Sequence, residues 1–258
     1  MARGVGPSLQ TDLMTELAYM VREDWAQRGT AMRQQSAMIR DWLGRPAYVF
    51  ATGDRKKYES DHSADREFVT YVARAADERS VIDLSALSQF RHGDEPLTRP
   101  LIALHPYEEQ DCELLRGVVQ AGNVARLFVI VWSPHDLVRT WLDGIRAVNL
   151  HSGSALKGPD PVQLEAAKCW VEEQYNGLSG GNGKDAVVQL LRVFTAAGYP
   201  LVTDTWLRAF FAAGGEFNEA TKVAKLIKEI HGGTRHRVKP RYRTNILDVL
   251  RERATEKA

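Results

Sequence analysis

The sequence predicts an α/β half followed by an all-helical half, and three observations carry this prediction. Short apolar segments alternate with amphipathic helical patterns between residues 47 and 150, which is typical of a parallel sheet covered on both faces. Beyond residue 160 the pattern is helical throughout. Between the two parts, the segment HSGSALKGPDP at 151–161 concentrates glycine, serine and proline, as domain boundaries do. We therefore expect two domains, over 1–150 and 160–258.

The first domain is expected to be a small Rossmann-like parallel sheet preceded by two helices. Apolar residues at helical spacing predict one helix between Leu9 and Trp25 and a second between Met32 and Leu43. Four strands are predicted by compact runs of β-forming residues, at 47–53, 80–84, 101–105 and 126–132. Helical patterns lie between or after them, at 65–79, 107–121 and 136–150. Residues 85–99 fit either a loop or a short helix.

The second domain begins at Asp160 and Pro161, which stand in the usual order for a helix N-cap and first turn. Three further helices are predicted at 185–197, 203–213 and 218–230. Their lengths and short connections fit a helix-turn-helix or winged-helix unit, whose third helix enters a DNA groove. An extended basic segment, GGTRHRVKPRYR, follows, and a last helix is expected from Thr244 to Arg253.

Composition describes an ordinary globular protein. Apolar residues make up 44% and charged residues 26% of the 258 residues, enough for a large core that needs no disulfide or metal. Cys112 and Cys169 lie far apart in apolar helical patterns and are expected to be buried, reduced thiols. Neither a signal-peptide pattern nor a membrane-length apolar run occurs, so we expect a cytoplasmic protein with no membrane contact.

The net charge of +1 conceals a strong asymmetry. From Lys222 to Lys257 there are eleven Lys or Arg against four Asp or Glu, a local excess of +7. Cations of this density supply the phosphate affinity on which nucleic-acid binding rests. The candidate residues for contact with DNA or RNA are Lys222, Lys225, Lys228, Arg235, Arg237, Lys239, Arg241 and Arg243. Three alternatives stay open: a solvated helix face, packing on an acidic surface of the same chain, or docking on another subunit of a homo-oligomer.

Polar residues follow each predicted strand of the α/β half. Parallel sheets bind ligands beyond the carboxyl ends of their strands, so these positions form a candidate site for a small anionic or nucleotide ligand. The residues concerned are Asp54, Arg55, Lys57, His62, Asp83, His105, Ser133 and His135. If all four strands are parallel, Asp54, Arg55, His105 and His135 should edge one pocket. Solvated loops would have the same composition, and no spacing among these residues indicates a metal site or identifies a cofactor.

Two short motifs fall short of a catalytic signature. SGGNGKD at 179–185 resembles a phosphate-binding loop, but Leu178 and Asp185 stand where that loop needs glycine and a hydroxyl residue. Ser133 and His135 lack the G-x-S-x-G context of a serine nucleophile. We interpret the first as an interhelical loop and discount the second.

Three functional hypotheses follow. The leading one is a ligand-sensing or regulatory protein that contacts nucleic acid through its basic C-terminal helical domain. The second is an enzyme that acts on a nucleotide or other phosphorylated substrate at the strand-end loops. The third is a non-catalytic interaction module.

Overall fold

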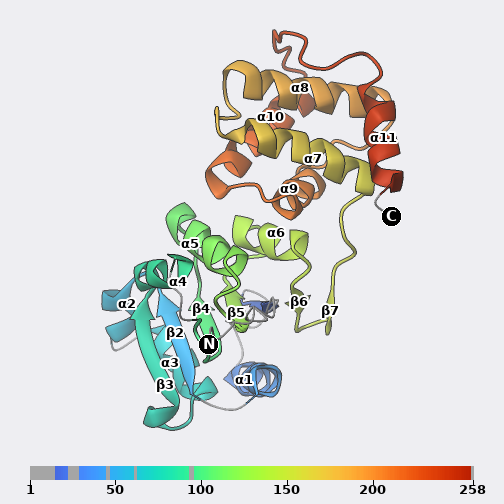
Figure 1. Cartoon of the computed structure of the whole chain (residues 1–258). Coiled ribbons are helices and arrows are strands. Elements are labelled where there is room, and N and C mark those ends of the chain that lie inside the picture. The colour runs from blue at the N-terminus through green and yellow to red at the C-terminus, as the bar shows by residue number, and fades with distance from the viewer. Residues whose placement is uncertain (1–14, 23–28, 45–46, 61–62, 93–95, 257–258) are drawn as a thin grey trace, which may run out of the picture.

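The computed structural model describes residues 15–22, 29–44, 47–60, 63–92 and 96–256. The described chain is mixed α/β, with a mainly parallel sheet and its covering helices at one end and a bundle of helices at the other (Figure 1). The sequence therefore predicts the change from α/β to all-helical structure correctly.

Within the described residues, seven strands form one sheet in the order β3-β2-β4-β5-β1-β6-β7. Neighbouring strands are parallel except for β6 and β7, which form a short antiparallel pair. The strands are β1 (Glu16–Val21), β2 (Tyr48–Thr52), β3 (Arg79–Asp83), β4 (Leu101–Leu104), β5 (Arg126–Val131), β6 (Val148–Asn149) and β7 (Ser154–Ala155). All four predicted strands are confirmed, and β4 runs parallel to β2 despite the short connection before it.

The first predicted helix is wrong, because Glu16–Val21 forms β1 in the middle of the sheet. Ala18 and Met20 are buried on one face of the sheet, and Tyr19 and Val21 are buried on the other. A strand that is covered on both sides is apolar at consecutive positions, so its residues also satisfy a helical spacing. Leu9, Leu13 and Trp25, which completed the pattern, lie outside the described residues.

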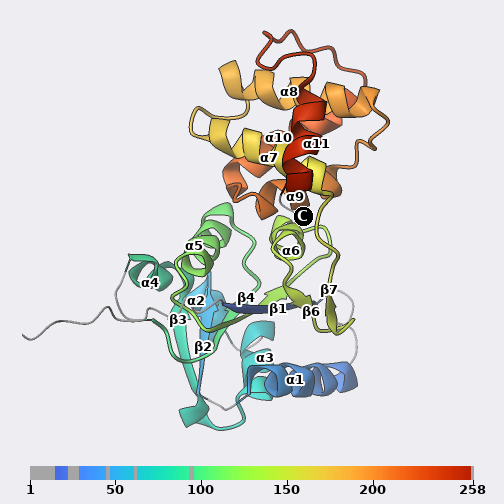
Figure 2. The ribbon, with the colours of Figure 1, turned by 45° about the vertical axis from the view of Figure 1, so that its right-hand side comes forward.

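Helices cover both faces of the sheet (Figure 2). One face packs against α1 and α3, and the opposite face against α4, α5 and α6. The helices and turns of this half are α1 (Gly29–Leu43), α2 (Arg55–Glu59), α3 (Ala64–Val72), η1 (Ala76–Glu78), η2 (Leu84–Leu87), α4 (Ser88–His92), α5 (Glu109–Gln120) and α6 (Leu137–Gly144). The undecided stretch at 85–99 thus holds a short helical turn and a short helix.

The adjacent strands β2 and β4 form a topological switch point, because the connections that follow them run in opposite directions along the sheet. The chain after β2 turns outward to β3 at the edge, whereas the chain after β4 turns inward to β5, and their helices cover opposite faces. Diverging connections open a crevice at the carboxyl ends of two such strands. The strand order differs from the 3-2-1-4-5-6 and 2-1-3-4-5 orders of dinucleotide-binding and flavodoxin-like sheets, but the same geometric rule applies.

The helical half consists of α7 (Pro161–Gln174), α8 (Gly181–Ala196), α9 (Thr203–Ala212), α10 (Phe217–His231) and α11 (Ile246–Glu256). The side chain of Asp160 caps α7 by accepting hydrogen bonds from the amides of Val162 and Gln163. Helix α9 packs against α6, and the approach is close because Gly144 has no side chain. A Cβ there would stand 2.7 Å from the carbonyl oxygen of Arg208.

The two halves share one buried apolar core. A single cluster extends from Val49 and Val129 in the sheet, through Trp141 on α6, to Trp206 and Val223 in the helical bundle. The division into two domains stays a prediction, but the expected separation of their cores is not observed. The segment at 151–161 also contributes β7, which pairs with β6 before the chain crosses to α7.

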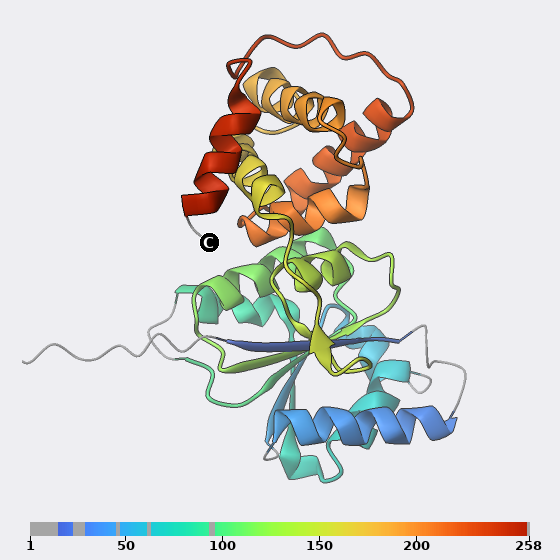
Figure 3. The same ribbon diagram turned by 90° about the vertical axis from the view of Figure 1, so that its right-hand side faces the viewer.

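The chain between α10 and α11 crosses the outer side of the helical bundle as an extended segment (Figure 3). We call residues 235–243 the basic strap. Gln189 on α8 holds it, because its side-chain oxygen accepts hydrogen bonds from the amides of Arg241 and Tyr242, at 2.7 and 3.1 Å. Arg192 adds a 2.7 Å hydrogen bond to the carbonyl oxygen of His236.

Candidate functional site

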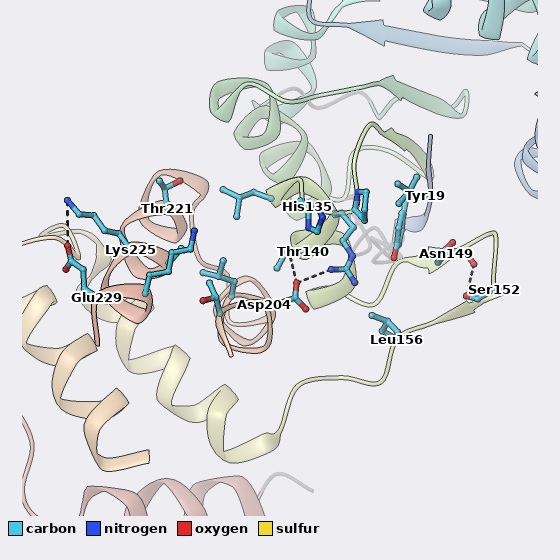
Figure 4. A pocket seen from close by; sticks show the side chains of 18 residues that line it. Tyr19, His135, Thr140, Asn149, Ser152, Leu156, Asp204, Thr221, Lys225 and Glu229 are labelled. Atoms are coloured by element: carbon cyan, nitrogen blue, oxygen red, sulfur yellow. Dashed lines mark hydrogen bonds and ion pairs between the residues drawn. The ribbon is translucent and has the colours of Figure 1, made fainter. Parts of the chain in front are cut away.

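A cavity of about 980 Å³ lies between the two halves of the molecule. We call it the central groove. One wall comes from the loop after β5 and from α6, and the other comes from α9 and α10 (Figure 4). Its polar lining residues are Tyr19, His135, Arg139, Thr140, Asn149, Ser152, Thr203, Asp204, Thr221, Lys225, Lys228 and Glu229.

Asp204 on α9 joins the two walls at the base of the groove. One of its carboxylate oxygens accepts hydrogen bonds from Arg139 at 3.0 Å and from Thr140 at 3.1 Å, both on α6. Its other oxygen lies 3.2 Å from Nε of Arg208 on its own helix. The α/β half and the helical half are therefore held together by polar contacts as well as by the apolar core.

Behind this contact, a buried tyrosine and a buried aspartate form a hydrogen-bonded pair beneath the central groove. The hydroxyl of Tyr19 on β1 donates a 2.5 Å hydrogen bond to Asp143, and Arg139 lies 2.7 Å from the second oxygen of that carboxylate. Burial raises the pKa of Tyr19 strongly, and the Asp143 carboxylate adds to the shift. Burial also raises the pKa of Asp143, although the Tyr19 hydrogen bond and the charge of Arg139 act against it. Tyr19 therefore stays a protonated donor, which suits a structural role.

The upper part of the groove is basic and accessible. Lys225 and Lys228 extend from α10, and the Lys225 side chain is 76% exposed and 4.0 Å from Glu229. His135 stands exposed on the opposite wall, directly after β5. Because Asp143 and Asp204 neutralise Arg139, the positive charge of the groove comes from Lys225 and Lys228, which face one carboxylate, Glu229. The groove can therefore attract an anion, and its threonine and serine hydroxyls can donate hydrogen bonds to it.

The predicted strand-end residues divide between several locations. Asp54, Lys57 and His105 line a second cavity, whereas His135 lines the central groove. Arg55 is exposed on α2 and lies 2.9 Å from Glu59, and Asp83 is exposed at the end of β3. The amide of Ser133 donates to Asp136, and His62 lies outside the described residues. Asp54 and His105 thus share a rim, but the expected single pocket does not include Arg55 or His135.

The predicted nucleic-acid residues also divide. Lys222 pairs with the buried Glu219 at 2.5 Å, and Lys225 and Lys228 face the α/β half across the central groove. Lys225 and Lys228 are nevertheless exposed, and a role of α10 in nucleic-acid contact stays a prediction. The remaining candidates are exposed on the basic strap: Arg235, Arg237, Lys239, Arg241 and Arg243.

Residues that complete the groove were not singled out in the sequence. Arg139 and Asp204 belong to helices predicted from their apolar faces, and Tyr19 lies on β1, where the sequence predicts a helix. Their roles depend on how α9 packs against α6, which the spacing of residues along the chain does not encode. Charged residues beside the apolar stripes of both helices were the one available signal.

Close packing accounts for a glycine in the segment at 179–185, most of which lies in α8. Gly183 lies in the first turn of α8, and a Cβ there would stand 2.3 Å from the carbonyl oxygen of Gly177. Leu178, at the position that broke the phosphate-loop pattern, is buried, and its amide donates a 2.6 Å hydrogen bond to Glu219. Only Ser179 and Gly180 of this motif therefore lie in the interhelical turn, and its residues from Gly181 onward begin α8 instead of the expected loop.

Two general properties bear on the chemistry. No cluster of three or more His, Cys, Asp or Glu side chains suited to a metal ion occurs among the described residues. Within the same part of the chain, every helix is too short or too polar to cross a membrane. Both cysteines are buried and free, and burial raises the pKa of each thiol.

Comparison of the chain with protein-family models, curated proteins and solved structures gives no significant match. The arrangement of the described side chains is therefore the basis for the function proposed below.

Proposed function

We propose that the protein is a ligand-sensing protein that binds a small phosphorylated molecule in the central groove. One observation supports this most directly: Lys225 and Lys228 of the helical half face His135 and Arg139 of the α/β half across one cavity. Phosphate groups are recognised by such converging cations and hydroxyl donors. The volume of about 980 Å³ is in the range of pockets that hold small ligands.

The sensing role rests on the position of the groove between the halves. A ligand that contacts α10 on one wall and the loop after β5 on the other binds most tightly when both walls have one relative position. Such a ligand shifts the conformational equilibrium of the protein towards that arrangement, to the extent that it binds this arrangement more tightly than others. The Asp204 contacts to α6 are the polar links that such a shift would alter.

The experiment measures binding of pyrophosphate, AMP and ATP to the full chain by calorimetry. Replacing Lys225 and Lys228 together with alanine should weaken binding by about tenfold or more, since each charge-assisted contact contributes roughly 1.5–3 kcal/mol when it is well formed. Lys56→Ala is the matched control, because Lys56 is an exposed lysine on α2 that lines neither cavity. Affinity should also fall as salt rises.

Equal losses in the control and in the double variant would contradict the groove as the site. So would an absence of binding at millimolar concentrations of all three anions by the folded protein. Thermal unfolding of each variant shows whether the fold is intact. Binding of a ligand to the native state alone raises the transition temperature, which gives a second readout.

A second candidate function, contact with a nucleic-acid backbone, is favoured by the geometry of the basic strap. Its exposed cations alternate with His236, Val238 and Tyr242, which are partly buried, and Val238 and Tyr242 pack on the core. Extended backbone places alternate side chains on the same side. Arg235, Arg237, Lys239 and Arg243 therefore form one outward row, while Arg241 is also paired with Glu173.

This candidate is tested by replacing those four residues with glutamate in the full chain. The quadruple variant should lose affinity for duplex and single-stranded nucleic acid, and the logarithm of the wild-type affinity should fall linearly with the logarithm of salt concentration. The Lys225 and Lys228 double variant serves as the comparison, because those lysines lie in the groove. Salt-independent binding, or equal losses in both variants, would contradict a role for the strap.

A further inference from the structure

A second cavity, of about 430 Å³, opens at the carboxyl ends of β2 and β4. We call it the strand-end crevice. Thr52, Gly53 and Asp54 line it at the end of β2, and Leu104 and His105 line it at the end of β4. This is the point where the two connections diverge to opposite faces of the sheet, and such points are the usual ligand sites of parallel sheets.

A buried ionic cluster forms the inner wall of the crevice. Nδ1 of His105 lies 2.6 Å from the carboxylate of Asp65, and the guanidinium of Arg22 lies 3.4 Å both from that carboxylate and from Nε2 of His105. Arg22 follows β1, and Asp65 lies in the first turn of α3. Three separate elements thus fix the orientation of the imidazole.

The backbone of His105 has a φ of 45°, a conformation that residues other than glycine adopt only at a cost in free energy. Strain of this kind persists where the surroundings hold a residue in place, and it is concentrated at binding sites. Here the Asp65 contact and a 3.0 Å hydrogen bond from the His105 amide to Ile130 hold the residue. The conformation sets the imidazole into the crevice wall.

Two aromatic rings at the mouth of the crevice are exposed. Trp132 is 52% and Tyr107 is 62% accessible to solvent, and both line the cavity. The edge of the His105 ring packs on Trp132 with 5.2 Å between centroids, and the Arg22 guanidinium lies 5.5 Å from the centre of the indole. The indole is therefore held in position while half of its surface is open, as in proteins that stack a planar ring on an aromatic side chain.

Carboxylates outnumber cations around the crevice. Asp54, Asp65 and Asp136 line it together with Lys57, and Arg22 stands behind it. In contrast to the central groove, cations do not outnumber carboxylates. A phosphate group is therefore not favoured, whereas an uncharged planar ring with hydrogen-bonding edges matches both the aromatic mouth and the polar wall.

We propose that the strand-end crevice binds a nucleobase of a free nucleoside, stacked on the exposed aromatic rings and hydrogen-bonded to the polar wall. The geometry assigns stacking to Trp132 and Tyr107, and recognition of the edge of the base to Asp54 and Lys57, while His105 packs on Trp132 and helps to position it. This site is separate from the central groove, so it does not rest on the function proposed above.

The test titrates adenosine, guanosine, cytidine and uridine into the full chain and follows binding by ligand-observed and protein NMR. At least one nucleoside should bind, and Tyr107→Ala should weaken that binding by about fivefold or more, in line with base stacking measured by alanine substitution. Tyr175→Ala is the matched control, since Tyr175 is 92% exposed on the helical half. Because Tyr107 is 62% exposed, its replacement removes little buried surface and the protein stays folded.

Trp132→Ala provides the second variant, and the protein NMR spectrum shows whether it is folded. Weaker binding in both crevice variants with an unchanged control supports the proposal. Equal affinity of the wild type and Tyr107→Ala overturns it. So does failure of all four nucleosides to bind the folded wild type at ligand concentrations tenfold above a Kd of roughly 1 mM, which is the value for weak binding. Loss of phosphate binding in the Lys225 and Lys228 variant has no bearing on this outcome.

Discussion

At the scale of residues, Asp65 at the start of α3 connects three elements of the fold through ionic contacts. It lies within ion-pair distance of His105 and Arg22 and so links α3 to the ends of β4 and β1. Burial on its own would raise the pKa of Asp65, but the hydrogen bond from His105 and the charges of His105 and Arg22 outweigh it and lower the pKa. The folded protein therefore favours the ionised carboxylate.

We expect Asp65→Asn to lower the free energy of unfolding at pH 7 by about 1.5–3 kcal/mol, the range for hydrogen bonds to charged groups. A carboxylate with a lowered folded pKa stabilises the native state above its unfolded pKa of about 4, and this contribution is lost as pH falls through the folded pKa. Urea unfolding at pH 7, 5 and 3 should show the difference between variant and wild type shrinking at the lowest pH. Asp248→Asn, in an exposed pair with Arg251, should change little at any pH.

The sequence identified part of this residue-scale chemistry. Asp54 and His105 were found because parallel strands bring their carboxyl ends to one edge. The sequence predicts Trp132 as the end of an apolar strand and Asp65 as the start of a helix, and neither pattern indicates a site. Which of these side chains meet depends on the packing of α3 against the sheet, and that packing follows from tertiary contacts instead of local spacing.

At the scale of elements, the contact of α6 with α9 depends on one missing side chain. Gly144 ends α6, and a Cβ there would meet the Arg208 carbonyl oxygen at 2.7 Å and Cβ of Phe211 at 3.2 Å. Both neighbours belong to α9, whose Asp204 joins the walls of the central groove. The glycine therefore sets the spacing of the two halves.

Gly144→Ala should destabilise the protein by about 1–3 kcal/mol, the usual cost of overpacking, even though alanine favours helix formation. Gly158→Ala is the control, because the nearest atom to its added Cβ would be 4.0 Å away. Chemical denaturation of both variants measures the difference. Equal stability of the two variants would show that α9 can move away from α6 at little cost.

Most elements were predictable, but the helix expected over 136–150 ends at Gly144 and is followed by strand β6, and β1 was expected as a helix. Helices α1, α5, α7, α8, α9 and α10 occur close to their predicted ranges, because each has an apolar stripe ended by glycine, proline or a cap. Strand β1 was missed because burial on both faces removes the alternation that distinguishes a strand from a helix. The placement of α10 against the groove was also missed, since its lysines look the same whether they face solvent or a cavity.

At the scale of the whole molecule, the continuous core makes the two halves interdependent. The apolar cluster crosses from the sheet into the helical bundle, while the connecting chain around Leu156 and Lys157 is exposed. The two halves are therefore held together in two separate ways, by the covalent connection and by packing of the shared apolar core.

A specific protease site inserted between Lys157 and Gly158 tests this separation. After cleavage, the two fragments should elute together in size-exclusion chromatography and unfold in one cooperative transition, because the buried cluster still joins them. The uncleaved insertion protein is the control for the insertion itself. Separate elution of two folded fragments would show that each half is stable alone.

The central position of β1 has a consequence for how the protein is made. Residues Glu16–Val21 pair with Arg126–Val131 and with the region of Val148, which follow much later in the chain. During synthesis, this apolar segment leaves the ribosome long before either neighbour exists, and strands that wait unpaired are prone to aggregate. The sheet therefore cannot close around β1 until its partner strands have been synthesised. A chaperone that binds β1 would protect it from aggregation until residue 150 has emerged.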